Sequence, residues 1–179
     1  MFELIIMTID FNSQLISTVC KRVRSEFKLD WRGIHGAPHW SRVMHHGLDL
    51  ANETGADPLV IKLFALIHDS CRYDEGDDKN HGNRAADFAT RMFNQGILHL
   101  SREQLEHLVN ACQGHSKGLL AAHPTVQTCW DADRLDLGRI GVRPDPRYLC
   151  TVQARCPQRI QRAWQWSRGE ALFNLNHLT

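Results

Sequence analysis

The chain has 179 residues, of which 42% are hydrophobic and 23% are charged, with 21 Lys and Arg against 20 Asp and Glu. This composition excludes a disordered chain, a collagen and a coiled-coil rod, and the net charge of +1 argues against a globally basic nucleic-acid binder. No apolar run approaches the roughly 20 residues that a membrane span needs.

The chain begins with a short apolar segment, residues 1–7, which lacks the basic region and the small-residue cleavage site of a signal peptide. We expect this segment to pack on the core. The six cysteines form no C-x-x-C pair, so a zinc ribbon or finger is not predicted. Without an export signal these cysteines are interpreted as free thiols, which predicts a cytoplasmic protein.

Apolar residues recur at helical spacing along almost the whole chain, and the alternation typical of strands is missing. A first helix is predicted over residues 11–27, and a second from Pro38 to about Thr54, where Gly55 ends it. Asp57 is expected to cap a third helix, which Pro58 opens.

The third helix is predicted over residues 59–67 and is apolar on every side except at Lys62. A helix that is apolar all round is buried, so we expect this one to lie at the centre of the fold. It runs directly into the doublet His68-Asp69.

A polar, glycine-containing loop is predicted over residues 70–82, followed by helices over residues 83–94, 101–112 and 125–137, the last ended by Gly138. Pro144 and Pro146 are expected to open one further helix, and Pro157 another. We therefore predict an all-α fold of about seven or eight helices in one domain over residues 1–179. Its core spans about residues 35–140, and the C-terminal helices of residues 144–170 pack on it.

Four ionisable side chains fall on predicted apolar helix faces: His39, His68, Asp69 and Asp133. A buried ionisable group must be paired, neutralised or bound to a metal. Asp69 follows a buried helix at its C-terminal end, where the helix dipole opposes a carboxylate, so a cation is expected beside it. Any one of these residues alone would be interpreted as a core histidine or a buried salt bridge. Together, two imidazoles and two carboxylates from three helices predict a divalent-metal site.

The choice of Asp133 over Asp131 rests on helical geometry. Val126, Trp130, Asp133 and Leu137 form one stripe, at offsets of four, seven and eleven. Asp131 lies about 200° away on the same helix. We expect Asp131 to pair with Arg134, to remain solvated, or to orient a ligand from outside the site.

The order of the four side chains resembles the HD-domain superfamily of metal-dependent phosphohydrolases. In that family the first histidine lies in an H-x-x-R-V-like stretch, as in HWSRV at residues 39–43. The HD doublet ends an apolar helix, and the last aspartate lies in an A-D-x-L-like stretch, as in ADRL at residues 132–135. The resemblance covers residue 35 to about residue 140. Residues 81–86 and 129–138 are also similar to a poorly characterised bacterial subgroup.

The resemblance implies a divalent ion, held by the four predicted ligands, whose bound water hydrolyses a nucleotide or another small phosphorylated metabolite. Asp69 would also orient that water. The nitrogen and oxygen ligands suit Mn, Fe, Co, Ni, Zn or, less well, Mg. The alternative hypothesis is a non-catalytic module of the HD fold that binds a nucleotide or RNA. The sequence leaves open the substrate, the number of ions and the oligomeric state.

Residues outside this set are candidates for further roles. In some HD proteins extra histidines bind a second metal, but His81 follows the doublet by only 12 positions, which does not match those subclasses well. We interpret His81 and His115 as candidates for acid–base catalysis or substrate contact, with a surface position as the alternative. Arg72, Arg84 and Lys117 flank these segments and are candidates for neutralising a phosphate.

A row of arginines near the C-terminus offers a different interpretation. Arg155, Arg159 and Arg162 share a predicted helix face, and Trp164 and Trp166 follow them. Basic residues beside aromatic ones can bind nucleic acid. We favour a helix packed on the core, with its arginines in solvent.

Overall fold

The structure, a computed structural model, describes the backbone of residues 2–169 and the side chains of residues 12–169. Its seven α-helices in this range are α1 (Phe2–Glu26), α2 (Ala37–Thr54), α3 (Pro58–Ile67), α4 (His81–Asn94), α5 (Arg102–Gly114), α6 (Pro124–Leu135) and α7 (Pro157–Ser167). Two 3₁₀ turns, η1 (Asp136–Ile140) and η2 (Pro146–Tyr148), complete the elements, and the described range contains no strand. The predicted all-α fold is confirmed. The packing expected of residues 1–7 falls on side chains outside the described set.

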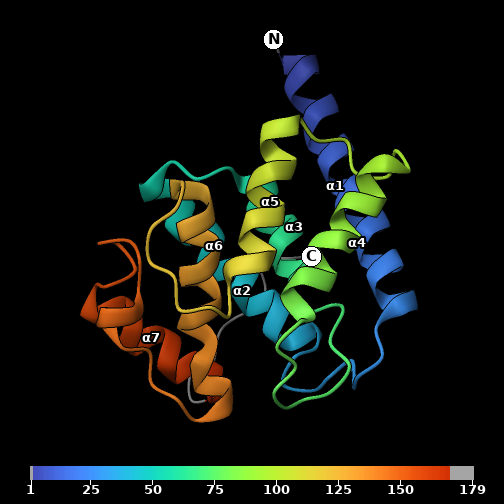
Figure 1. Cartoon of the computed structure of the whole chain (residues 1–179). Helices are drawn as coiled ribbons and strands as arrows, with labels where there is room; N and C mark the ends of the chain where they lie inside the picture. Colours follow the sequence, from blue (N-terminus) through green and yellow to red (C-terminus); the bar gives the residue numbers. More distant parts are fainter. Residues whose placement is uncertain (1, 170–179) are drawn as a thin grey trace.

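Helix α3 occupies the centre of the bundle and contacts α1, α2, α4, α5 and α6 (Figure 1). Seven of its ten residues are buried. Asp57 caps the helix by accepting hydrogen bonds from the backbone N–H groups of Leu59 (2.8 Å) and Val60 (3.4 Å). The central helix that Asp57, Pro58 and the apolar run predict is therefore present.

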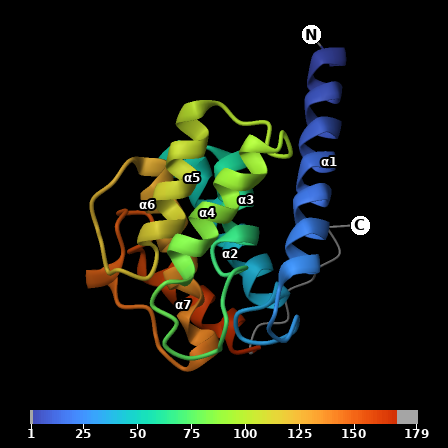
Figure 2. The ribbon, with the colours of Figure 1, turned by 45° about the vertical axis from the view of Figure 1, so that its right-hand side comes forward.

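Helix α1 lies along the outer side of the bundle, against α3 (Figure 2). Helices α2 and α6 pack against each other on another side of α3. A Cβ atom at Gly47 of α2 would lie 2.5 Å from a methyl carbon of Ile61 and 3.4 Å from the Cβ of Ala132. The absence of a side chain there allows α2, α3 and α6 to come close together, which brings their polar residues within reach of one another.

The chain after α6 differs from the predicted pattern. The helix ends at Leu135, and η1 continues it through Gly138, so the predicted stop at Gly138 is wrong. Pro144 and Pro146 open only the three-residue turn η2 rather than an α-helix. The carboxylate of Asp131 binds the backbone N–H groups of Cys150 and Thr151, which are thereby withdrawn from any helical pattern.

Helix α7 packs on α2 and α6 through a small apolar cluster made of Leu50, Leu135, Leu149, Ala154, Ile160 and Ala163. The side chain of Arg159 is only 10% exposed and pairs with Asp49 (2.9 Å) and Glu53 (2.7 Å) of α2. Trp166 lies against His45 and His46. The packed helix agrees with the favoured interpretation, but the solvent position expected of its arginines is wrong for Arg159, which is buried and paired with α2.

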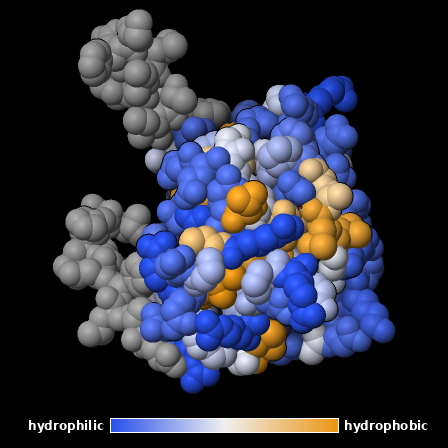
Figure 3. Space-filling model, turned by 90° about the vertical axis from the view of Figure 1, so that its left-hand side faces the viewer, coloured by the Kyte–Doolittle hydropathy of each residue, from blue (hydrophilic) through white to orange (hydrophobic). Residues whose placement is uncertain are grey.

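On the face that lies to the left in Figure 1, apolar side chains form separate patches among polar ones (Figure 3). Among the described residues, no helix combines the length and the apolar character needed to cross a membrane.

Candidate metal centre

The four predicted ligands meet at the centre of the bundle, although they come from three helices. The Nε2 atom of His39 in α2 lies 3.1 Å from Nε2 of His68, which caps the C-terminus of α3. Asp69 and Asp133 approach the same point, with oxygens 3.6 Å and 3.4 Å from Nε2 of His39. Both histidines are fully buried.

Hydrogen bonds at the far side of each ring assign the tautomers of the two histidines. Nδ1 of His39 donates to Oδ2 of Asp136 (2.7 Å), and Nδ1 of His68 donates to the backbone carbonyl of Phe64 (3.0 Å). A neutral imidazole carries one proton, so both Nε2 atoms present lone pairs. Burial lowers the pKa of His68 to about 3, which keeps that ring neutral. Two lone pairs that face each other at 3.1 Å call for a cation between them.

Asp133 supplies a second indication that a cation belongs here. Its Oδ1 atom is buried and has no hydrogen-bond partner, since Nε2 of His39 carries no proton to donate. Burial raises the pKa of this carboxyl group, but His39, Arg139 and His68 lower it more, so it stays ionised. An ionised, buried oxygen without a hydrogen-bond partner fits a metal ligand.

Asp136, which the sequence analysis missed, fixes the orientation of His39. Its carboxylate is fully buried, accepts from Nδ1 of His39 and pairs with Arg42 (2.5 Å to Nε). Carboxylates that accept from a metal-bound histidine orient the ring and raise its basicity. The signal was present in the sequence, because Asp136 follows Asp133 by one helical turn.

An Asp136→Asn variant should bind its metal about 10- to 100-fold more weakly, because His39 loses its charged acceptor. Calorimetric titration of metal-free protein with Mn²⁺ would measure this change. Asp49→Asn is the matched control, since Asp49 is also a carboxylate paired with an arginine but lies at the surface of α2. Equal affinity in Asp136→Asn and Asp49→Asn would show that Asp136 does not position the ligand.

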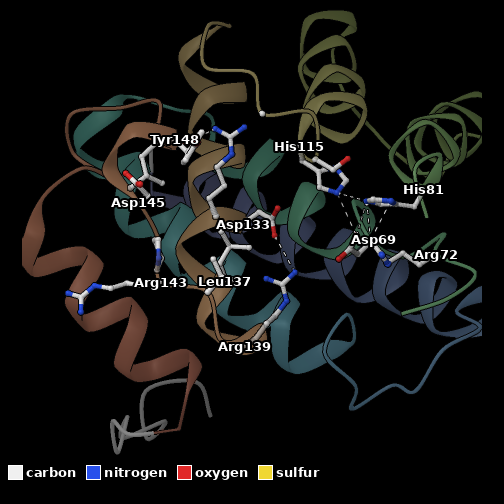
Figure 4. A pocket seen from close by; sticks show the side chains of 16 residues that line it. Asp69, Arg72, His81, His115, Asp133, Leu137, Arg139, Arg143, Asp145 and Tyr148 are labelled. Carbon is white, nitrogen blue, oxygen red and sulfur yellow. Dashed lines mark hydrogen bonds and ion pairs between the residues drawn. The ribbon is translucent and has the colours of Figure 1, made fainter. Parts of the chain in front are cut away.

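A second cluster adjoins the first and shares Asp69 with it. Nε2 of His81 lies 2.7 Å from Nε2 of His115, and the two atoms lie 3.3 Å and 3.6 Å from Oδ1 of Asp69. Nδ1 of His81 donates to the carbonyl of Asp78, and Nδ1 of His115 donates to the carbonyl of Cys112 (2.7 Å). The two Nε2 atoms therefore meet beside one carboxylate oxygen, as Figure 4 shows.

The sequence did not indicate this arrangement, because His81 follows the doublet by only 12 positions. The loop after Asp69 turns back so that α4 begins at His81, beside the C-terminal end of α5. A Cβ atom at Gly82 would lie 2.4 Å from the carbonyl oxygen of Cys112 and 3.3 Å from Cε1 of His115. Glycine at this position therefore allows α4 and α5 to approach until His81 meets His115.

The charges of this cluster are set by burial and by Asp69. Burial raises the pKa of Asp69, but His68 and His115 lower it more, so the pKa lies well below its usual value. Burial lowers the pKa of His81. Burial also lowers the pKa of His115, but Asp69 raises it more. Asp69 thus remains a carboxylate that faces two pairs of histidines.

The predicted phosphate-binding residues lie in different places. Arg72 is buried beside the second cluster, 3.4 Å from Oδ1 of Asp69, and also donates to the carbonyl of Gly76 (2.6 Å). Arg84 does not line the cavity of the two clusters: it binds the carboxylate of Asp78 and the carbonyl of Cys71. Lys117 lines a separate hollow beside α5 and the start of α6.

Asp69 and Asp133 of the first cluster and His81 and His115 of the second line one cavity of about 540 Å³, whereas His39 and His68 lie behind them. Arg139 of η1 reaches this cavity, with its guanidinium 3.8 Å from Oδ1 of Asp133 (Figure 4). Hydrogen bonds to the carbonyls of Ile34 and Asp136 hold it there. Arg139, which no sequence pattern indicated, lies where a phosphate beside Asp133 would need a donor.

Comparison with known proteins identifies one family. A family model of the HD domain matches residues 37–141, which includes every member of the two clusters. Searches of curated proteins and of solved structures found no match to the chain.

Proposed function

The chain belongs to the HD-domain family, and we propose that it is a metal-dependent phosphohydrolase acting on a nucleotide or another small phosphorylated molecule. The set of metal ligands favours this hydrolase over the non-catalytic module that the sequence leaves open. A binding module needs neither a complete set of metal ligands nor a carboxylate shared between two histidine pairs.

One observation carries the proposal: the two oxygens of Asp69 face different histidine pairs. Oδ2 lies 3.6 Å from Nε2 of both His39 and His68, whereas Oδ1 faces His81 and His115. A carboxylate that faces two sets of lone pairs suits two divalent ions. We therefore propose His81 and His115 as ligands of a second ion, in place of the acid–base role that the sequence suggested.

A pair of divalent ions, when bound, would polarise the phosphoryl oxygens and lower the pKa of a coordinated water toward neutrality. Asp69 would contact both histidine pairs, and Asp136 would hold the proton of His39 on Nδ1, so that Nε2 faces the metal position. Arg139 would donate to the phosphate once Asp133 is engaged with a cation. Arg72 already donates to Asp69, the loop carbonyls and His81, so we propose that it holds the loop.

The test is phosphate release by the purified protein, after its metal content has been measured by mass spectrometry. Metal-free and Mn²⁺-loaded protein would be given phosphomonoesters, phosphodiesters and nucleoside triphosphates in parallel. We expect release from at least one class, and only with metal present. Nucleotide binding without release of phosphate or of a nucleoside product would support the non-catalytic module instead.

Asp78 is expected to control the second ion through the loop. Its carboxylate accepts from the N–H of Tyr73 (2.8 Å) and pairs with Arg84, while its carbonyl accepts from Nδ1 of His81. Asp78→Asn should loosen this loop and lower the affinity for the second ion by about 10-fold, while the affinity for the first ion stays unchanged.

Metal content at limiting Mn²⁺ would measure this effect. Asp77→Asn is the matched control, because Asp77 is exposed in the same loop and pairs only with exposed Lys79 among the described residues. Equal loss of both ions in Asp78→Asn would contradict a selective role for Asp78.

A further inference from the structure

The cavity has a wall that lies beyond the residues matched by the family. Val142, Arg143, Pro144, Asp145, Tyr148 and Leu149 all line it. Figure 4 places Arg143, Asp145 and Tyr148 across the cavity from His81 and His115. A ligand whose phosphate lies at the two clusters would therefore meet residues 142–149 with the rest of its structure.

This wall is fixed to α6 by buried polar groups. Asp131 is fully buried, and its carboxylate accepts from the N–H groups of Cys150 (2.6 Å) and Thr151 (2.8 Å) and from the Thr151 hydroxyl (2.7 Å). Arg134 donates to the carbonyl of Tyr148 (2.8 Å). The sequence suggested that Asp131 pairs with Arg134 or stays solvated, and both of these expectations are wrong. Asp131 holds the segment that follows Tyr148 in place before a ligand binds, so less conformational entropy is lost on binding.

The side chains of the wall indicate what kind of group it binds. Tyr148 is 59% exposed and Val142 is 49% exposed, so aromatic and apolar surface is available at the cavity. Arg143 donates to Gln161 (2.7 Å), and no carboxylate among the described residues pairs with it. Asp145, in contrast, is paired with Arg147 (2.6 Å). The Arg143 guanidinium points away from the two clusters in Figure 4, toward Gln161 of α7, and Arg147 lies 5.9 Å from the centre of the Tyr148 ring. The wall therefore offers mainly the exposed aromatic ring of Tyr148.

We propose that residues 142–149 form the subsite for the leaving group of the substrate and that this group is a nucleoside whose base stacks on Tyr148. This inference rests on the proposed phosphohydrolase function. A cavity of about 540 Å³ falls in the size range of sites for drug-sized ligands, far larger than inorganic phosphate requires. A sugar alone would need several polar partners for its hydroxyl groups, whereas a planar base suits an exposed aromatic ring.

The test compares nucleoside 5′-monophosphates with glycerol phosphate, which lacks a base, on Mn²⁺-loaded protein. Tyr148→Ala should lower kcat/KM about tenfold for the best nucleotide, mainly through KM, and leave kcat/KM for glycerol phosphate unchanged. Tyr148→Phe keeps the ring and should behave as the wild type. Val152→Ala is the control, since Val152 is 74% exposed and does not line the cavity. An equal loss for both substrates, or no loss for the nucleotide, would overturn the subsite.

Equilibrium binding separates this inference from the proposed function. Calorimetric titration with the same nucleotides should show about tenfold weaker binding to Tyr148→Ala, even if the wild type hydrolyses none of them. That result would keep the subsite and overturn the hydrolase. If the Tyr148→Ala change does not affect hydrolysis of the nucleotide, the hydrolase stands and the subsite is overturned. A wild type that binds no nucleotide would also overturn the subsite.

Discussion

An Asp69→Ala variant should bind neither ion tightly and should release phosphate about a thousandfold more slowly than the wild type. The reason is that Asp69 is, among the described residues, the one carboxylate that both histidine pairs share, so its loss removes a ligand from each ion at once. Metal ions contribute several kcal/mol of transition-state stabilisation, which corresponds to a rate change of that order. Metal content and phosphate release, measured on the same preparation, would show the two losses together.

Two comparisons separate this effect from misfolding. Asp77→Ala removes an exposed carboxylate from the same loop and should keep both ions and full activity. His68→Ala should remove the first ion and the activity, because His68 lies only in the first cluster. An Asp69→Ala protein that keeps its helical circular dichroism and its full metal content would refute the assignment of Asp69 as a shared ligand.

Asp133→Asn and Asp131→Asn should fail in different ways, although the two residues lie on the same helix. Asp133→Asn keeps the shape of the side chain but removes the charge that offsets a cation, so we expect loss of the first ion and nearly all hydrolysis. Asp131→Asn should keep both ions. It weakens three buried hydrogen bonds to Cys150 and Thr151, which should lower the free energy of unfolding by about 1–3 kcal/mol.

The two variants are best measured side by side, with metal content by mass spectrometry and stability by urea unfolding. A metal-free Asp131→Asn beside a metal-loaded Asp133→Asn would reverse the assignment. Equal stability of Asp131→Asn and the wild type would show instead that the hydrogen bonds of Asp131 do not hold the 148–151 segment.

The parts of the site that the sequence could predict lie on regular helices. Asp57 and Pro58 determine where α3 begins, so its length brings His68 and Asp69 to its C-terminal end. The stripe that contains Asp133 selects it over Asp131 because α6 is regular from Pro124 to Leu135. Helical periodicity suffices for such residues, since position along a regular helix determines direction.

The parts that could not be predicted depend on loops and on close helix contacts. His81 meets His115 because the loop after Asp69 turns back and because Gly82 permits close packing. Neither feature has a periodic signature. Arg139 reaches the cavity from a 3₁₀ turn, where helical spacing no longer gives the direction of a side chain.

Metal-dependent hydrolysis is the central claim about this protein, and one titration can test it. Metal-free protein would be titrated with Mn²⁺ while phosphate release from a mixture of nucleoside mono-, di- and triphosphates is followed. We predict no release without Mn²⁺ and a rise that levels off near two ions per chain, as expected for a two-metal site. No release at any Mn²⁺ concentration, or equal release with and without the metal, would contradict the account.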